Sequence, residues 1–398
     1  MTIIIVVVGV AIVWLYLFFS LIRLTHLTKG WAITATIAMS LILVGSVLAA
    51  ILSRIMGTSD FRVPIMAASL GISVVFYLCL GLIPVVAIAG VIWFFTRPLA
   101  VQATHAMIES GQSTGKGRLL TIRILTVFMI VMSLAVTGYG FVRAQQPKLS
   151  PVTLQFDSLP SSFDGFTIAL ITDLHIGAAT RTSFLPSVVA QVNAATPDLI
   201  VIAGDTVNGS VEDLGEQMSI LGDLIAPYGV VLTTGNHDFY PCAPQWMEYF
   251  SSLGLTVLDN DGILLQRGQY RIQVLGIHDK QGEGEMAPDL DQATQRVSQI
   301  QRLGGESFGI LVAHEPVQVF DPGMRASGVS LQLSGHTHGG QLFPWGIATL
   351  FKQPTLDGVH RFNGVTLVTS RGVGNWASPV RVGADPEIPI ITLVTTTE

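Results

Sequence analysis

Long apolar runs dominate the chain before about residue 145, and they constrain its fold more than any other feature. A helix needs about 20 mostly apolar residues to cross the hydrocarbon core of a bilayer, and each run is long enough for one span. The runs comprise residues 3–22, 31–52, 65–95 and 119–142. The sequence therefore predicts an N-terminal α-helical membrane bundle of about four spans within residues 1–143.

Two of these runs allow a second interpretation. Residues 65–95 are too long for one upright helix and include Pro84, so we expect one tilted or kinked span, with a re-entrant pair as the alternative. Residues 3–22 are also similar to the apolar part of a signal peptide. No basic residue precedes this run and further spans follow it, which favours an uncleaved helix.

The Lys and Arg residues of the short loops favour one orientation of the spans. With the N-terminus outside, five of them fall on the inner side: Arg23, Lys29, Arg97, Lys116 and Arg118. Four fall on the outer side: Arg54, Arg62, Arg143 and Lys148. Because cytoplasmic loops carry the excess of basic residues, this small difference predicts an integral cell-membrane protein with its C-terminal domain outside the cytoplasm.

The composition changes after the last apolar run. Residues 144–160 contain three prolines and are predicted to form a linker, and residues 161–398 are predicted to form a domain folded in water. The two cysteines, Cys79 and Cys242, do not make a disulfide framework. A net charge of −6 without a basic cluster argues against nucleic acid as the main partner.

Short apolar segments alternate with amphipathic ones in the second half of the chain. The apolar segments, which predict buried strands, comprise residues 166–172, 198–203, 229–233, 308–313 and 329–333. The amphipathic segments, which predict helices, comprise residues 183–195, 211–226, 243–253 and 286–303. This alternation predicts an α/β domain, in which polar residues that follow the strands converge on one edge of the sheet.

A polar motif directly follows each predicted strand. The motifs read Asp173-Leu174-His175, Gly204-Asp205, Gly235-Asn236-His237-Asp238, His314 and Gly335-His336-Thr337-His338. Their carboxylate, carboxamide and imidazole donors, without a thiolate, suit Mn, Fe, Zn or Mg. In extended backbone, residues two apart share a face, so the Asp-x-His and His-x-His pairs can each present two donors together. One carboxylate such as Asp205 can bridge two cations about 3.5–4 Å apart.

The five motifs, in this order, resemble the pattern of the calcineurin-like metallophosphoesterase superfamily: D-x-H, G-D, G-N-H-[DE], a lone His and G-H-x-H. The resemblance covers residues 173–338. The membrane segment and the extended G-H-T-H-G-G-Q block at residues 335–341 are similar to transmembrane proteins with a metallophosphoesterase domain. The fold implied by the resemblance is a four-layer α/β/β/α sandwich.

The resemblance also implies two divalent metal ions and a role for each motif residue. The first metal would be held by Asp173, His175 and His338. The second would be held by Asn236, His314 and His336, with Asp205 bridging the two. His237 would donate a proton to the leaving oxygen or steady the phosphoryl group, and Asp238 would orient His237.

Other polar residues stay outside the predicted site. His278, Asp279, Asp357 and His360 are interpreted as loop residues, and Arg371 and Asn375 as parts of a turn. Some members of the superfamily have a further acid three residues after the G-D motif, where this chain has Asn208. This departure affects the expected metal preference or pH optimum without removing a ligand.

The leading hypothesis is a membrane-anchored phosphoesterase that hydrolyses phosphate ester or pyrophosphate bonds by a two-metal mechanism. Its anchoring makes a lipid-linked substrate, such as UDP-2,3-diacylglucosamine, attractive, and membrane lipids are the other predicted partner. The alternative is a membrane sensor or scaffold that keeps the metal site without turnover. A transporter is disfavoured because the apolar runs lack paired charges.

Overall fold

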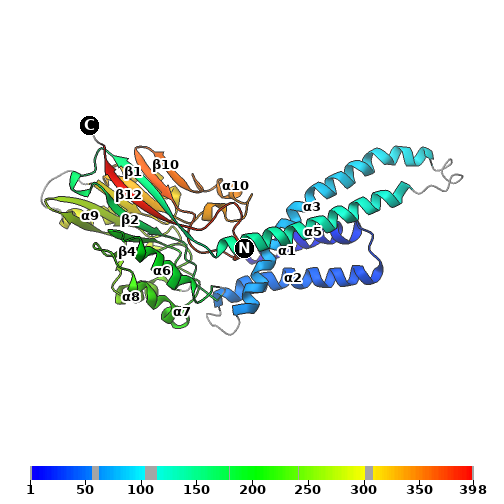
Figure 1. The fold of residues 1–398 in the computed structure, drawn as a ribbon, viewed down its shortest axis with the longest axis horizontal. Helices are drawn as coiled ribbons and strands as arrows, with labels where there is room; N and C mark the ends of the chain where they lie inside the picture. The colour runs from blue at the N-terminus through cyan, green and yellow to red at the C-terminus, as the bar shows by residue number, and fades with distance from the viewer. Residues whose placement is uncertain are drawn as a thin grey trace. The chain divides into compact units, whose positions relative to one another are not determined.

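The computed structural model describes residues 2–55, 62–103, 114–178, 180–240, 242–300 and 308–396. The chain forms two compact units. Their helices and strands are labelled along the ribbon in Figure 1. The helical unit comprises Met1–Ala50 and Ala67–Tyr139, and the other unit comprises Ile51–Met66 and Gly140–Glu398. We call the part of the second unit from Gly140 onward the α/β unit, and we describe the two units separately.

The described residues of the N-terminal part of the chain are mostly helical. Its elements are α1 (Thr2–Phe18), a π-helical turn (Phe19–Arg23), α2 (Lys29–Ile55), α3 (Arg62–Ala103) and α5 (Thr114–Ala144). Within the described residues, three helical stretches are long and apolar enough to cross a membrane: Lys29–Leu48, Val63–Phe94 and Gly117–Ala144. The first predicted span gives a shorter apolar helix, Val7–Arg23. The third predicted span is one continuous helix through Pro84, not a re-entrant pair.

Several polar side chains of the helical unit form hydrogen bonds within it. Trp14 Nε1 donates to Ser40 Oγ (3.0 Å), and the Tyr16 hydroxyl donates to the carbonyl oxygen of Cys79 (3.1 Å). Arg123 donates to the carbonyl oxygens of Thr25 and His26 at 2.9 and 3.0 Å. Because hydrocarbon offers no hydrogen bonds, such internal pairs are what a membrane-embedded bundle requires.

The α/β unit contains two six-stranded sheets. The first has the order β1-β12-β2-β3-β4-β5, with strands Lys148–Phe156, Glu387–Thr395, Phe166–Ile171, Leu199–Ala203, Val230–Thr233 and Thr256–Val257 in that order. The second has the order β10-β11-β9-β8-β7-β6, with strands Gly358–Phe362, Val365–Thr369, Val329–Ser334, Phe308–Val312, Tyr270–Gly276 and Asp261–Arg267. Strands β2 to β5 are parallel, and so are β7, β8 and β9.

The central strands β2, β3 and β4 of the first sheet are buried on both faces because each face is covered. In β2, Ile168 and Leu170 pack into the core between the two sheets, whereas Ala169 and Ile171 pack against helices. The helices on that outer face are α6 (Phe184–Ala194), α7 (Val211–Met218) and α8 (Ala243–Ser252). Helix α9 (Leu290–Ile300) covers the outer face of the second sheet. The predicted four-layer α/β/β/α sandwich is therefore confirmed.

The segment predicted as a linker instead contains β1. This strand pairs in parallel with β12, from Lys148 with Glu387 to Phe156 with Thr395. Its side chains Leu154 and Phe156 reach the core between the sheets. Pro151 fits because β1 is the edge strand of its sheet, where a missing N–H is tolerated. The proline-containing segment therefore forms an edge strand and not a flexible linker.

Candidate metal centre

The predicted ligands come together at the carboxyl ends of the central strands of both sheets. Asp173 and His175 follow β2, Asp205 follows β3, Asn236 follows β4, His314 follows β8, and His336 and His338 follow β9. Among the described residues, three groups have ligand atoms within 4.8 Å of one another: Asp173, His175 and His338; His175, Asp205 and His237; and Asp205, His314 and His336. Asp205 belongs to two of the groups, which suits a carboxylate shared by two cations.

The first group brings two imidazoles and a carboxylate to one point. Nε2 of His175 lies 3.0 Å from Nε2 of His338, and Nε2 of His338 lies 3.4 Å from Oδ1 of Asp173. Oδ2 of Asp205 lies 3.5 Å from Nε2 of His175. All four side chains are buried. Because such a concentration of donor atoms is costly to bury without a cation, the arrangement fits a divalent metal.

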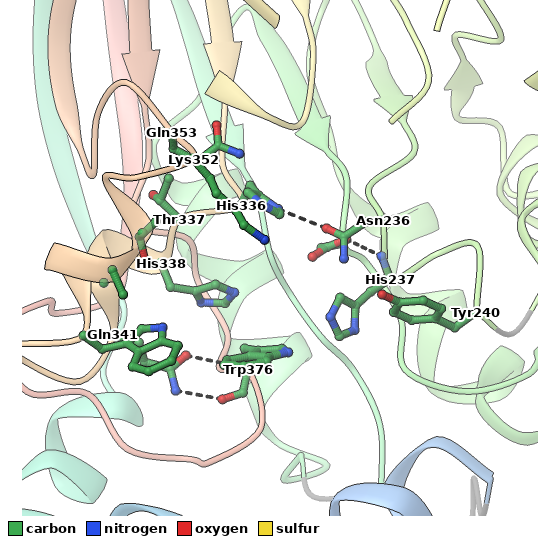
Figure 2. A pocket seen from close by; sticks show the side chains of 15 residues that line it. Asn236, His237, Tyr240, His336, Thr337, His338, Gln341, Lys352, Gln353 and Trp376 are labelled. Atoms are coloured by element: carbon green, nitrogen blue, oxygen red, sulfur yellow. Dashed lines mark hydrogen bonds between the residues drawn. The ribbon is translucent and has the colours of Figure 1, made fainter. Parts of the chain in front are cut away.

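The second group is built around His314. Its Nδ1 donates to the carbonyl oxygen of Ala203 (2.8 Å), which fixes the ring and leaves Nε2 for a ligand. This Nε2 is buried, lies 3.2 Å from Oδ2 of Asp205 and makes no hydrogen bond to any described residue. His336 Nδ1 lies 3.0 Å from Oδ1 of Asn236, as the dashed line in Figure 2 shows. An unsatisfied buried nitrogen beside a carboxylate fits a second cation.

The backbone bends sharply at the ligands. Asp173, His175, Asp205, His336 and His338 all have positive φ, between 46° and 69°, which non-glycine residues rarely adopt. Such conformations persist where the surrounding structure fixes them, and they cluster at functional sites. The neighbouring glycines allow the backbone of one motif to lie close to the ligand residues of another motif.

Two of these glycines touch ligand residues of another motif. A Cβ atom at Gly235 would lie 2.3 Å from the backbone nitrogen of Asp205, and one at Gly335 would lie 2.3 Å from Oδ2 of Asp173. Any larger side chain at either position would displace a ligand. The glycines of these motifs are therefore required by contact between strands, and not by a turn alone.

Burial and mutual charge set the protonation of the ligands. Burial lowers the pKa of His175 to about 3 and that of His336 to about 4, so both imidazoles are neutral and available to a metal. Burial raises the pKa of Asp173 to about 6. Burial also opposes the charge of Asp205, but His314 and His175 hold the pKa of this carboxyl well below its usual range. Asp205 is therefore the permanent anion at the centre of the site.

His237 lies beside the ligands and is held from three directions. Its backbone N–H donates to Oδ1 of Asp205 (2.7 Å), and its Nδ1 lies 2.8 Å from Oδ1 of Asn208. Its ring contacts Tyr240 edge-on. Asp238 accepts backbone N–H bonds from Gly235, Thr206 and Val207 at 2.8, 2.9 and 3.2 Å. In these contacts Asn208 orients the ring of His237, the role predicted for Asp238, while Asp238 holds the loops that carry Asp205 and Asn236.

Two further residues at this edge were not assigned to the site from the sequence. Arg381 is fully buried, and its Nη2 lies 3.1 Å from Nδ1 of His338. No local pattern marks it, because its contacts come from distant loops. Asp279 is fully buried after β7, and its Oδ2 makes no hydrogen bond to the described residues. The sequence could have indicated Asp279 as a site residue, because it follows an apolar strand as the five motifs do.

A cavity of about 470 Å³ opens beside the ligands (Figure 2). Its wall includes Asp205, Asn236, His237, His336 and His338. It is also lined by the aromatic rings of Tyr240, Trp345 and Trp376. The exposed Lys352 extends into it. The cavity thus combines metal-binding groups, one cation and apolar rings, a combination suited to a phosphate attached to an apolar or cyclic group.

Comparisons with known proteins agree with this geometry. The calcineurin-like phosphoesterase family profile matches residues 166–340. A transmembrane protein with metallophosphoesterase domain from Danio rerio is 31% identical over 274 residues, which cover 67% of this chain and 62% of that protein. The chain therefore matches under two thirds of the length of this relative.

Other matches extend the comparison. An uncharacterized metallophosphoesterase of Helicobacter pylori strain ATCC 700392 / 26695 is 30% identical over 268 residues, 66% of this chain and 69% of that protein. The solved 5'-nucleotidase precursor from Thermus thermophilus aligns with a TM-score of 0.36 and 15% identity, covering 57% of this chain and 54% of that one. By its sequence matches to the Helicobacter pylori protein and to the family profile, the chain belongs to the calcineurin-like metallophosphoesterase family.

Proposed function

We propose that this protein hydrolyses phosphate ester or phosphoanhydride bonds with two divalent metal ions at this site. The observation that carries the proposal is the position of Asp205, whose carboxylate lies within reach of both ligand groups. A pair of cations sharing such a carboxylate supplies an activated water and neutralises phosphoryl charge. Asp173, His175 and His338 would hold one ion, and Asn236, His314 and His336 the other.

The residues around the ligands perform the remaining tasks. His237 lines the cavity and is oriented by Asn208, so it can give a proton to the leaving oxygen, a contribution worth about 10²–10⁴-fold. Lys352 extends into the same cavity and can bind a phosphoryl oxygen as a point charge. Asp238 keeps the loops of Asp205 and Asn236 in register through backbone bonds.

We propose a lipid-linked phosphate as the substrate class, to which UDP-2,3-diacylglucosamine belongs. The membrane spans and the aromatic wall of the cavity support this class. The orientation is part of the proposal: the basic residues favour an extracytoplasmic site, whereas nucleotide-activated lipids lie on the cytoplasmic face. Labelling a single cysteine placed at Ile225, on intact cells, with an impermeant reagent decides between nucleotide-linked and other lipid phosphates.

The first test is hydrolysis of bis-p-nitrophenyl phosphate by the detergent-purified chain with added Mn²⁺. Wild-type protein should turn over, and Asp205→Ala should lose at least about 10³-fold in kcat, because both ions depend on its carboxylate. Asp223→Ala, at an exposed carboxylate, is the matched control and should keep full activity. Metal content and circular dichroism are measured in parallel. A folded, metal-loaded Asp205→Ala protein with normal turnover would falsify the proposal, and a metal-loaded wild type inert towards phosphate esters and lipid pyrophosphates would favour the sensor or scaffold.

A further inference from the structure

An unusually apolar and exposed segment adjoins the metal cavity. Residues 342–351 contain no charged side chain, and we call them the apolar segment. Its exposed large side chains are Phe343 (68%), Trp345 (49%), Ile347 (63%), Leu350 (49%) and Phe351 (87%). The short helix α10 (Gly346–Thr349) lies within it. So many neighbouring apolar groups on a domain surface mark an interaction site.

The apolar segment also forms part of the cavity rim. Trp345, Ala348 and Thr349 line the cavity that contains the metal ligands, and Lys352 follows the segment directly. Trp376 lies on the same wall, where its carbonyl accepts a hydrogen bond from Gln341 Nε2 (2.8 Å). Whatever covers the apolar segment therefore sits at the entrance to the site.

The segment begins beside the end of the last membrane helix. Phe343 N–H donates to the carbonyl of Val382 (2.9 Å), and Val382 N–H donates to the carbonyl of Gln341 (2.8 Å). On the other side of this connection, Arg381 N–H donates to the carbonyl of Gly140 (3.0 Å). A Cβ at Gly140 would lie 2.7 Å from a methyl group of Val382. One residue, Val382, thus links the start of the apolar segment to the last turn of α5.

The position of the apolar segment near the end of α5 indicates what it binds. The candidate span Gly117–Ala144 ends in the turn that contacts Val382, so the α/β unit meets the chain where it leaves hydrocarbon. A surface rich in Phe, Trp, Ile and Leu and flanked by Lys has the composition of groups that lie at a membrane interface. A protein partner would also find few polar groups there with which to form specific hydrogen bonds.

We propose that the apolar segment docks into the surface of the bilayer and opens the metal cavity towards the lipid. Phe343, Ile347 and Phe351 enter the interface, and Trp345 sits at the level of the headgroups. The consequence for catalysis rests on the function proposed above: a phosphate carried on a membrane lipid reaches the cavity along the segment, and its chains stay in the bilayer. The docking itself does not depend on turnover.

The docking is tested on the full chain in lipid nanodiscs. Phe351→Cys is made in a background in which Cys79 and Cys242 are replaced, and a nitroxide label is attached. Its relaxation by dissolved oxygen, which concentrates in lipid, is compared with its relaxation by a water-soluble nickel chelate. Ile225→Cys is the matched control, because Ile225 is equally apolar, 72% exposed and lies before β4, at the opposite edge from the site.

Three outcomes are distinguishable. High oxygen access with low nickel access at position 351, and the reverse at position 225, is the result expected for membrane docking. Nickel access at 351 equal to that at 225 places the segment in water and overturns the proposal. Low access to both reagents places the segment against protein, for instance a second copy of the chain, and overturns it equally.

A kinetic experiment then connects docking to the substrate. The double variant Ile347→Ser with Phe351→Ser should raise KM for a vesicle-embedded phosphodiester lipid by about tenfold or more, since two apolar anchors are lost. The double variant should leave hydrolysis of bis-p-nitrophenyl phosphate unchanged. The control variant Ile225→Ser should leave hydrolysis of both substrates unchanged. Equal KM values for the lipid in all three proteins would contradict the role in substrate access. A wild type inert towards both substrates would instead contradict the proposed function, while the label result would still decide on docking.

Discussion

Asn208 is the residue whose contacts most directly control His237. Its Oδ1 lies 2.8 Å from Nδ1 of His237 and 3.3 Å from Nδ1 of His175, and its Nδ2 donates to the carbonyl of His175 (3.3 Å). Because an amide oxygen only accepts, both rings present Nδ1–H to it, and Nε2 of each is left for the site. A neutral amide therefore orients two imidazoles without adding a charge.

Replacing this amide by a carboxylate should change the pH dependence of catalysis. In Asn208→Asp, an anion about 3 Å from the ring nitrogen of His237 favours the imidazolium form. If His237 donates a proton, the alkaline limb of the kcat/KM profile should move to higher pH, on the order of one unit. Asn193→Asp, at a residue on α6, is the control and should leave the profile in place. An unmoved limb in Asn208→Asp would argue that His237 is not the proton donor.

The convergence of the proposed metal ligands was predictable from the sequence, whereas the residues that position them were only partly so. Each proposed ligand follows an apolar strand segment, and the carboxyl ends of parallel strands share one edge, so their convergence could be inferred. Asn208 was noticed only as a departure from the family pattern. Arg381 lies in a loop with no strand signal, and its contact with His338 depends on two loops that meet only in the folded unit.

At the scale of elements, the predictions succeeded where burial on both faces gives an unbroken apolar run. Strands β2, β3, β4, β8 and β9 lie within one or two residues of their predicted ranges. Strand β10 was missed because it is almost wholly exposed, and β5 because it has only two residues. Strands β1 and β12 each contain a proline, which argues against a strand unless the pairing is known.

Arg381 joins two loops at the candidate metal centre. Its guanidinium donates to the carbonyl of His338 in one loop and to those of Arg371, Gly374 and Ala384 in the other, at 3.1, 2.6, 3.1 and 3.3 Å. Burial lowers the pKa of Arg381 to about 10, which leaves it charged at neutral pH. One planar side chain therefore satisfies backbone groups of both loops and fixes the position of His338.

Arg381→Lys should loosen this junction while keeping the charge. A single ammonium cannot reach the same set of carbonyls, so His338 loses its fixed orientation and metal affinity should fall about 10–100-fold. Metal affinity is measured by titration of the metal-free protein below its unfolding temperature. The matched control is Arg371→Lys, whose side chain pairs with Glu387 and not with a ligand. Unchanged metal affinity in a folded Arg381→Lys protein would contradict this role.

At the scale of the whole molecule, the last turn of α5 belongs structurally to the α/β unit. Ala144 is fully buried there, and Arg143 Nε donates to Oδ1 of Asp385 (2.9 Å). The guanidinium of Arg181 lies 5.3 Å from the centre of the Phe141 ring. Only residues 145–147 separate α5 from β1, because α5 ends at Ala144 and Lys148 already pairs in the sheet.

The ion pair at this junction should give a small, acid-sensitive contribution. The hydrogen bond from Arg143 lowers the pKa of Asp385, so the stabilisation is complete above the ordinary carboxyl pKa of about 4 and is lost as pH falls through the lowered value. Asp385→Asn should speed amide exchange at residues 140–144 at pH 7, with a cost of at most about 1 kcal/mol because the pair is partly exposed.

The exchange experiment carries its own controls. The difference between Asp385→Asn and wild type should vanish in acid, where the wild-type carboxyl is also protonated. Asp261→Asn removes the comparable surface pair with Arg296 and should leave exchange at residues 140–144 unchanged. Equal exchange in all three proteins at pH 7 would show that the junction does not depend on this pair.

The strand order of the first sheet has a consequence for how the protein is made. Strand β12, which follows all the other described strands in the sequence, lies between β1 and β2. During synthesis, β1 has no partner in its sheet, and the edge of β2 stays open, until β12 has left the ribosome. The membrane helices, by contrast, are complete some 250 residues earlier. Insertion into the bilayer therefore precedes closure of the first sheet, and a chain truncated before β12 would be anchored in the membrane with an unfinished sheet.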